Sequence, residues 1–166
     1  MIEVDVIIQS PLWYEVRADI EPYLEGLCKD ILSQTGVTVF ISHSELSVTL
    51  TDDAAIRVLN KRYRHKDSAT NVLSFPASVI NPEYFDQIDT LDGYAMLGDI
   101  VLSIETLRKE AQEQDKSLEA HFTHLLVHGI LHLLGYDHET DEEAAIMEQC
   151  EVDILAHFGI PSPYGT

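Results

Sequence analysis

Residues 124–138 read HLLVHGILHLLGYDH, and His128, His132, Gly135 and His138 fall at metal-ligand spacing in this stretch. His128 and His132 are four residues apart, so on a helix both imidazoles project from one face, one turn apart. Gly135 follows the apolar run and favours the left-handed conformation that ends a helix, so the chain can turn back at His138. The spacing predicts a helix that carries two metal ligands, followed by a turn that supplies a third.

Three histidines without a nearby cysteine are typical of a catalytic zinc site. Neutral imidazoles bind Zn²⁺ at about 2.0–2.1 Å, and three of them leave the fourth tetrahedral position to water. We therefore predict one Zn²⁺ per chain, bound by His128, His132 and His138. His124 lies on the same helical face, but a rise of about 12 Å separates it from His132, too far for one ion to bridge. We expect His124 to pack beside the site instead.

The same spacing, H-x3-H-x2-G-x2-H, occurs in the metzincin peptidases, with one difference. Those peptidases follow the first histidine with a glutamate that takes a proton from the zinc-bound water, whereas this chain has Gly129. A zinc metallopeptidase is therefore an open alternative, although the glycine weighs against it. Asp137, next to the third histidine, is expected to be a loop residue or a hydrogen-bond partner of a ligand rather than a base.

Length and composition restrict the class of protein. The 166 residues suffice for one domain, residues 1–166, with one core. There is no run of about 18 apolar residues and no charged-then-apolar leader, so we expect a soluble, cytoplasmic protein with no membrane partner. Cys28 and Cys150 are far apart, without a C-x-x-C pattern, and are expected to be buried, reduced thiols.

The distribution of charge points to an anionic partner despite a net charge of −19, which by itself repels phosphate at long range. Half of the ten Lys and Arg residues fall in one short window: Arg57, Lys61, Arg62, Arg64 and Lys66. Two interpretations stay open. The cluster is either the solvated C-terminal end of a helix, where cations are favoured, or a surface that binds phosphate groups.

Apolar periodicity predicts both strands and helices. Strands are expected at residues 2–8, 46–50, 71–75 and 97–102. One helix is expected over residues 16–32, and four more are expected to begin after Thr51, Ser103, Ser117 and Thr140 as N-caps. Pro76 suits either the end of a strand or an edge strand, and residues 77–95 are predicted to form a long surface loop.

Three motifs resemble those of the YbeY family of bacterial endoribonucleases. They are HGILHLLGYDH at 128–138, YRHKDSATNVLSFP at 63–76 and LGDIVLS at 97–103, and Gly129 agrees with the family. The resemblance implies a single compact α+β domain with a mixed, mostly short-stranded central sheet, about five helices and a zincin-like active-site helix. It also implies a zinc-dependent, single-strand-specific endoribonuclease that acts in 3′-end maturation of small-subunit (16S) ribosomal RNA and in late-stage ribosome quality control.

The resemblance also assigns residues and partners. It maps the zinc ligands and the essential arginine of the family onto His128, His132, His138 and Arg64. A guanidinium can hold two phosphate oxygens as negative charge develops on them. The residues then expected to steer the RNA backbone are Lys61, Arg62 and Lys66. The implied partners are single-stranded RNA and the small ribosomal subunit, and a non-catalytic ribosome-assembly factor stabilised by zinc is a further alternative.

Overall fold

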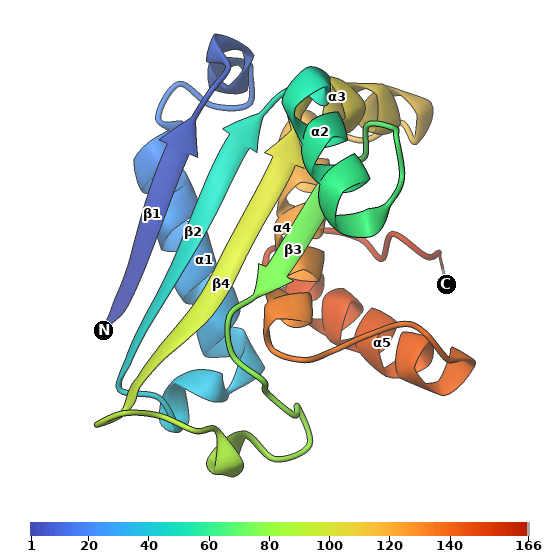
Figure 1. The fold of residues 1–166 in the computed structure, drawn as a ribbon. Helices are drawn as coiled ribbons and strands as arrows, with labels where there is room; N and C mark the ends of the chain where they lie inside the picture. The colour runs from blue at the N-terminus through green and yellow to red at the C-terminus, as the bar shows by residue number, and fades with distance from the viewer. Residues whose placement is uncertain (166) are drawn as a thin grey trace.

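A four-stranded mixed sheet forms the centre of the computed structural model, which describes residues 1–165 (Figure 1). The strands are β1 (Ile2–Ile8), β2 (His43–Thr51), β3 (Val72–Pro76) and β4 (Tyr94–Ser103). Their order in the sheet is β1-β2-β4-β3, with β1, β2 and β4 parallel and β3 antiparallel to β4. The short strand β3 is thus an edge strand that ends at Pro76, which agrees with both alternatives for this proline.

Five α-helices and three short 3₁₀ helices complete the fold of residues 1–165. The α-helices are α1 (Ile20–Thr35), α2 (Asp53–Arg64), α3 (Ile104–Glu113), α4 (Leu118–Leu133) and α5 (Asp141–His157). The 3₁₀ helices are η1 (Pro11–Glu15), η2 (Val37–Val39) and η3 (Phe85–Gln87). The predicted α+β class is confirmed. None of these helices is both long and apolar enough to cross a bilayer.

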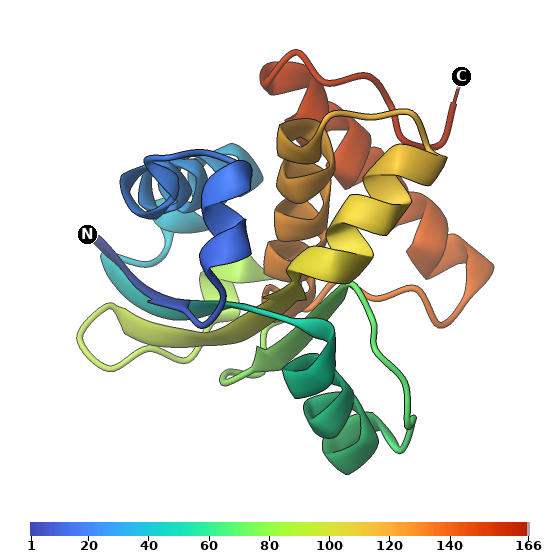
Figure 2. The same cartoon turned by 90° about the horizontal axis from the view of Figure 1, so that it is seen from above.

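Most helices lie on one face of the sheet, and α4 is the central one (Figure 2). α1 and α4 pack against this face, α3 and α5 pack against α4, and α2 lies on the opposite side of the sheet. Because α4 has neighbours around most of its circumference, it buries the consecutive residues Leu125, Leu126 and Val127, which project in three different directions. The helix predicted to carry two metal ligands therefore has its backbone held rigidly by the core.

Some element boundaries differ from the prediction. The N-cap of α2 is Asp52 rather than Thr51, because the Asp52 carboxylate accepts a hydrogen bond from the Ala55 N–H at 2.9 Å. Thr51 instead ends β2, where its hydroxyl donates to the side chain of Gln9 at 2.8 Å. The helix expected from residue 16 begins at Ile20, and the 77–95 loop contains η3 and ends where β4 begins.

Candidate metal centre and catalytic cleft

A capped helix and a glycine turn bring the three predicted ligands together. Ser117 starts α4 by accepting a hydrogen bond from Ala120 N–H at 3.0 Å. At the other end, Gly135 N–H donates to His132 O and Tyr136 N–H donates to Leu131 O, the pair of bonds that defines a Schellman cap.

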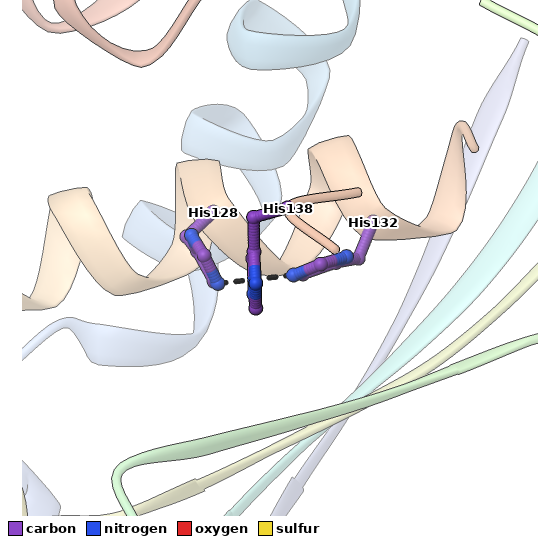
Figure 3. A group of neighbouring side chains, drawn as sticks. All are labelled: His128, His132 and His138. Atoms are coloured by element: carbon purple, nitrogen blue, oxygen red, sulfur yellow. Dashed lines mark hydrogen bonds between the residues drawn. The ribbon is translucent and has the colours of Figure 1, made fainter. Parts of the chain in front are cut away.

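Gly135 is required at this turn for two reasons. Its φ is +96°, a left-handed conformation that L side chains rarely adopt. A Cβ at this position would also lie 1.9 Å from the carbonyl oxygen of Ile80. Any other residue would therefore have to move either the turn or the neighbouring loop. The turn directs the chain back along α4, so that His138 lies beside the two helical histidines (Figure 3).

The three imidazoles form one compact group. Nε2 of His128 and Nε2 of His132 are 3.1 Å apart, and one ring nitrogen from each of the three histidines lies within 4.8 Å of the others. His138 is exposed, whereas His128 and His132 are half-buried. Figure 3 shows the three rings converging below α4. A group open on one side can bind an ion and still admit a further ligand.

The protonation pattern of the two helical histidines fits a metal ion. His128 Nδ1 lies 2.6 Å from a Glu151 carboxylate oxygen, and His132 Nδ1 lies 2.9 Å from the Tyr136 carbonyl oxygen. Both partners only accept hydrogen bonds, so each Nδ1 carries the proton and each Nε2 keeps its lone pair. Two lone pairs at 3.1 Å repel each other, and a cation between them removes this repulsion.

The pKa of His132 supports the same form of the ring. Burial, followed by the charges of His128 and His138, lowers the pKa of His132 from 6.5 to about 4. The ring is therefore neutral near pH 7, and a neutral imidazole is the form that binds a metal.

A cleft of about 660 Å³ joins the three histidines to Arg64, which comes from the far end of α2. The Arg64 guanidinium donates a hydrogen bond from Nη2 to the Ser74 carbonyl oxygen at 2.9 Å and lies 5.9 Å from the centre of the Phe75 ring. One end of the guanidinium is thus fixed on the edge strand β3. Because the side chain is otherwise exposed, its remaining N–H groups are accessible to an anion in the cleft.

The other predicted RNA-binding cations divide between two surfaces. Lys66 lines the same cleft as Arg64, whereas Lys61 and Arg62 line a separate hollow with Arg57. Arg64 lies one turn after Asn60 on the face of α2 that lines the cleft, and His65 then ends α2 in the left-handed conformation, with φ of +60°, before Lys66. The structure therefore brings Arg64 and Lys66 to the histidines and leaves Lys61 and Arg62 outside the cleft.

Gly129 faces the sheet at the point where α4 approaches it most closely. A Cβ at Gly129 would lie 3.1 Å from a methyl group of Ile100 and 3.2 Å from the Ser74 hydroxyl oxygen. That hydroxyl donates to the Gly129 carbonyl oxygen at 3.2 Å. A glutamate at this position, as in metzincins, would therefore require Ile100 or Ser74 to shift.

Asp137 was expected to be a loop residue or a hydrogen-bond partner of a ligand. Its position agrees, since its carboxylate accepts a hydrogen bond from the backbone N–H of His138 at 2.8 Å.

Glu151 is the site residue that sequence reasoning missed. It lies on α5, far from the histidines in sequence, yet its carboxylate contacts His128 directly. A signal was present: Glu151 falls in the buried stripe of α5 with Met147, Ile154 and Leu155, at i, i+4, i+7 and i+8. A carboxylate within an apolar stripe needs a partner, because an unpaired buried charge is costly.

Comparison with known proteins identifies the family. A profile described as Endoribonuclease YbeY matches residues 14–159. The chain belongs to this family. A YbeY relative named Endoribonuclease YbeY, from Bradyrhizobium diazoefficiens, is 51% identical over 162 residues, covering 96% of this chain and 84% of the relative. Another protein of that name, from Bradyrhizobium sp. strain BTAi1, is 44% identical over 160 residues, covering 96% of this chain and 90% of the relative.

A solved structure shares the YbeY fold described above. The solution structure of TM1509 from Thermotoga maritima superposes with a TM-score of 0.54 and 24% sequence identity, covering 96% of this chain and 92% of that chain. At this identity the likeness shows the fold alone. The resemblance that the three motifs indicated is confirmed by the family profile and by the two relatives.

Proposed function

We propose that this protein is a zinc-dependent endoribonuclease that cleaves single-stranded RNA. The observation that carries the proposal is the cleft, which places Arg64 and Lys66 opposite three histidines able to bind one metal ion. A metal site beside an arginine and a lysine suits a phosphodiester, whose negative charge must be stabilised during cleavage. The names of the two Bradyrhizobium relatives support the same activity.

The chain's own residues divide the work. His128, His132 and His138 would hold the Zn²⁺, which supplies Lewis-acid chemistry when bound. Arg64, fixed at one end by Ser74 O, orients the scissile phosphate and stabilises charge that develops on its oxygens. Lys66 attracts the neighbouring backbone phosphate groups.

The proposal extends to the biological substrate and place of action. We infer that the RNA is small-subunit ribosomal RNA, cleaved at its 3′ end during maturation and in late-stage quality control, with the small ribosomal subunit as partner in the cytoplasm. The support is the membership in the YbeY family. It agrees with the charge distribution, because a chain of net charge −19 repels RNA over most of its surface, while Arg64 and Lys66 line the cleft beside the histidines.

A zinc peptidase using the same histidines is the competing activity, since an edge strand can pair with a peptide. Two contacts disfavour it. Arg64 occupies the outward carbonyl oxygen of Ser74 on β3, and Gly129 packs against the sheet where a peptidase carries its base. A non-catalytic assembly factor is disfavoured by the open side of the histidine group, because a structural zinc site is closed by protein ligands.

The test compares substrates on one preparation. Zinc-loaded protein is incubated with a single-stranded RNA, the same RNA as a duplex, and an unfolded polypeptide, each with and without chelator. We expect cleavage of the single strand alone, abolished by chelator and restored by added Zn²⁺. His138→Ala, at the exposed ligand, should be inactive in all arms. Cleavage of the polypeptide would favour the peptidase, and no cleavage of any substrate would favour the assembly factor.

A further inference from the structure

Glu151 is a fully buried carboxylate whose polar neighbours are two histidine rings and a tyrosine hydroxyl. One carboxylate oxygen lies 2.6 Å from His128 Nδ1 and 3.7 Å from His124 Nε2. The other oxygen accepts a hydrogen bond from the Tyr164 hydroxyl. No lysine or arginine of residues 1–165 forms a salt bridge with this carboxylate.

Hydrogen bonds from a ring N–H and a hydroxyl satisfy this buried carboxylate. His128 donates from Nδ1 to one oxygen at 2.6 Å, and the Tyr164 hydroxyl donates to the other. An acceptor at this position holds a proton on Nδ1 of His128, which leaves Nε2 to face the other two histidines.

Tyr164 comes from the segment that follows α5 and returns past α4 (Figure 1). Its hydroxyl bonds Glu151, and its ring packs edge-on against His124, with 5.9 Å between ring centres. The C-terminal segment therefore covers the side of the carboxylate that does not face His128. This contact keeps Glu151 away from water, where its pull on the His128 proton would be weakened.

The two helical ligands differ in what holds their Nδ1 protons. His132 donates to a neutral backbone carbonyl, of Tyr136, whereas His128 donates to an anion. A carboxylate partner raises the basicity of a ligand histidine and fixes its tautomer and ring orientation more strongly than a carbonyl does. An effect of Glu151 should accordingly appear at His128 and not at His132.

We propose that Glu151 and Tyr164 are positioning residues for the metal centre. Glu151 holds His128 as the Nδ1–H tautomer with Nε2 aimed at the ion, and Tyr164 fixes Glu151 and shields it from water. The inference rests on the proposed metal site and adds α5 and the C-terminal segment to it. Neither residue contacts the RNA or the ion directly.

The test measures metal affinity, independently of RNA cleavage. Zn²⁺ dissociation constants of the full-length protein are obtained by competition with a chromophoric chelator. Glu151→Gln should bind about 10- to 100-fold more weakly, the usual effect of removing such a partner. Tyr164→Phe, which removes one hydroxyl, should bind about 2- to 10-fold more weakly. Glu148→Gln makes the same change at an exposed position of α5 and should match the wild type.

A second readout follows the rings themselves. Nitrogen-15 NMR of the zinc-loaded proteins reports the tautomer of each histidine, and a mixed or inverted His128 tautomer is expected in Glu151→Gln with His132 unchanged. Wild-type affinity and an unchanged His128 tautomer in Glu151→Gln would overturn the inference and leave the proposed function standing. If that variant does not fold, Tyr164→Phe with wild-type affinity has the same meaning. A wild-type protein that binds no zinc would instead refute the metal-dependent function.

Discussion

Replacing Arg64 with alanine should slow RNA cleavage by about 100- to 1,000-fold while zinc content is unchanged. One end of the guanidinium is committed to Ser74 O, so the free N–H groups are available to phosphate oxygens. Each charge-assisted hydrogen bond contributes about 1.5–3 kcal/mol. Because Arg64 is exposed to solvent, we take the lower part of this range, which gives about 3–4 kcal/mol for two such bonds. At about 1.36 kcal/mol for each factor of ten, this gives the stated range.

The fold should tolerate this substitution. Arg64 is exposed at the end of α2, and alanine removes its hydrogen bond to Ser74 O, which costs about 1 kcal/mol in the free energy of unfolding. Arg64→Lys keeps the charge and loses the planar guanidinium, so its rate should fall between those of the alanine variant and the wild type. This comparison separates a geometric role from charge neutralisation.

The assay is single-turnover cleavage of one labelled RNA at saturating protein and fixed salt. Arg62→Ala is the matched control, because Arg62 lies on the same helix but lines a different hollow. Its rate should stay within about threefold of the wild type, as for a remote surface charge. Lys66→Ala should lower the affinity for RNA and make that affinity less dependent on salt, with a smaller effect on the cleavage rate. An Arg64→Ala protein that cleaves at the wild-type rate would refute the catalytic role of Arg64.

Three further outcomes are expected. His132→Ala and His138→Ala should each lose stoichiometric zinc by elemental analysis, and retention of the metal in folded protein would contradict the ligand assignment. Gly129→Glu should lower the melting temperature sharply without creating casein cleavage, because the side chain would enter the contact with Ile100. In metal-free protein, the lowered pKa of His132 means that only the unfolded chain binds this proton between about pH 6.5 and 4. The free energy of unfolding should thus fall by about 1–2 kcal/mol as pH drops through this window, a value reduced for solvent screening at the half-buried ring. Urea titrations of the wild type and of His132→Gln measure this loss. A wild type that loses no more stability than His132→Gln would contradict the prediction.

Local patterns in the sequence determined the helix that carries His128 and His132. Helical spacing, the Ser117 cap and the Gly135 turn all act within a few residues, so the convergence of His128, His132 and His138 followed from the sequence. The strands and the α+β class were predictable for the same reason, since burial imposes a period on each element. The N-cap of α2 shows the limit of local patterns. The sequence predicted Thr51, but the N-cap is Asp52, because β2 extends to Thr51 through pairing with β4.

Helix packing determines which distant residues join the histidines. Residues 57–66 contain five similar cations, yet Arg64 lies with Asn60 on the face of α2 that lines the cleft, whereas Lys61 and Arg62 line a separate hollow. Glu151 reaches His128 because α5 packs against α4. These contacts depend on how helices pack through side chains far apart in sequence, and no short-range spacing encodes them.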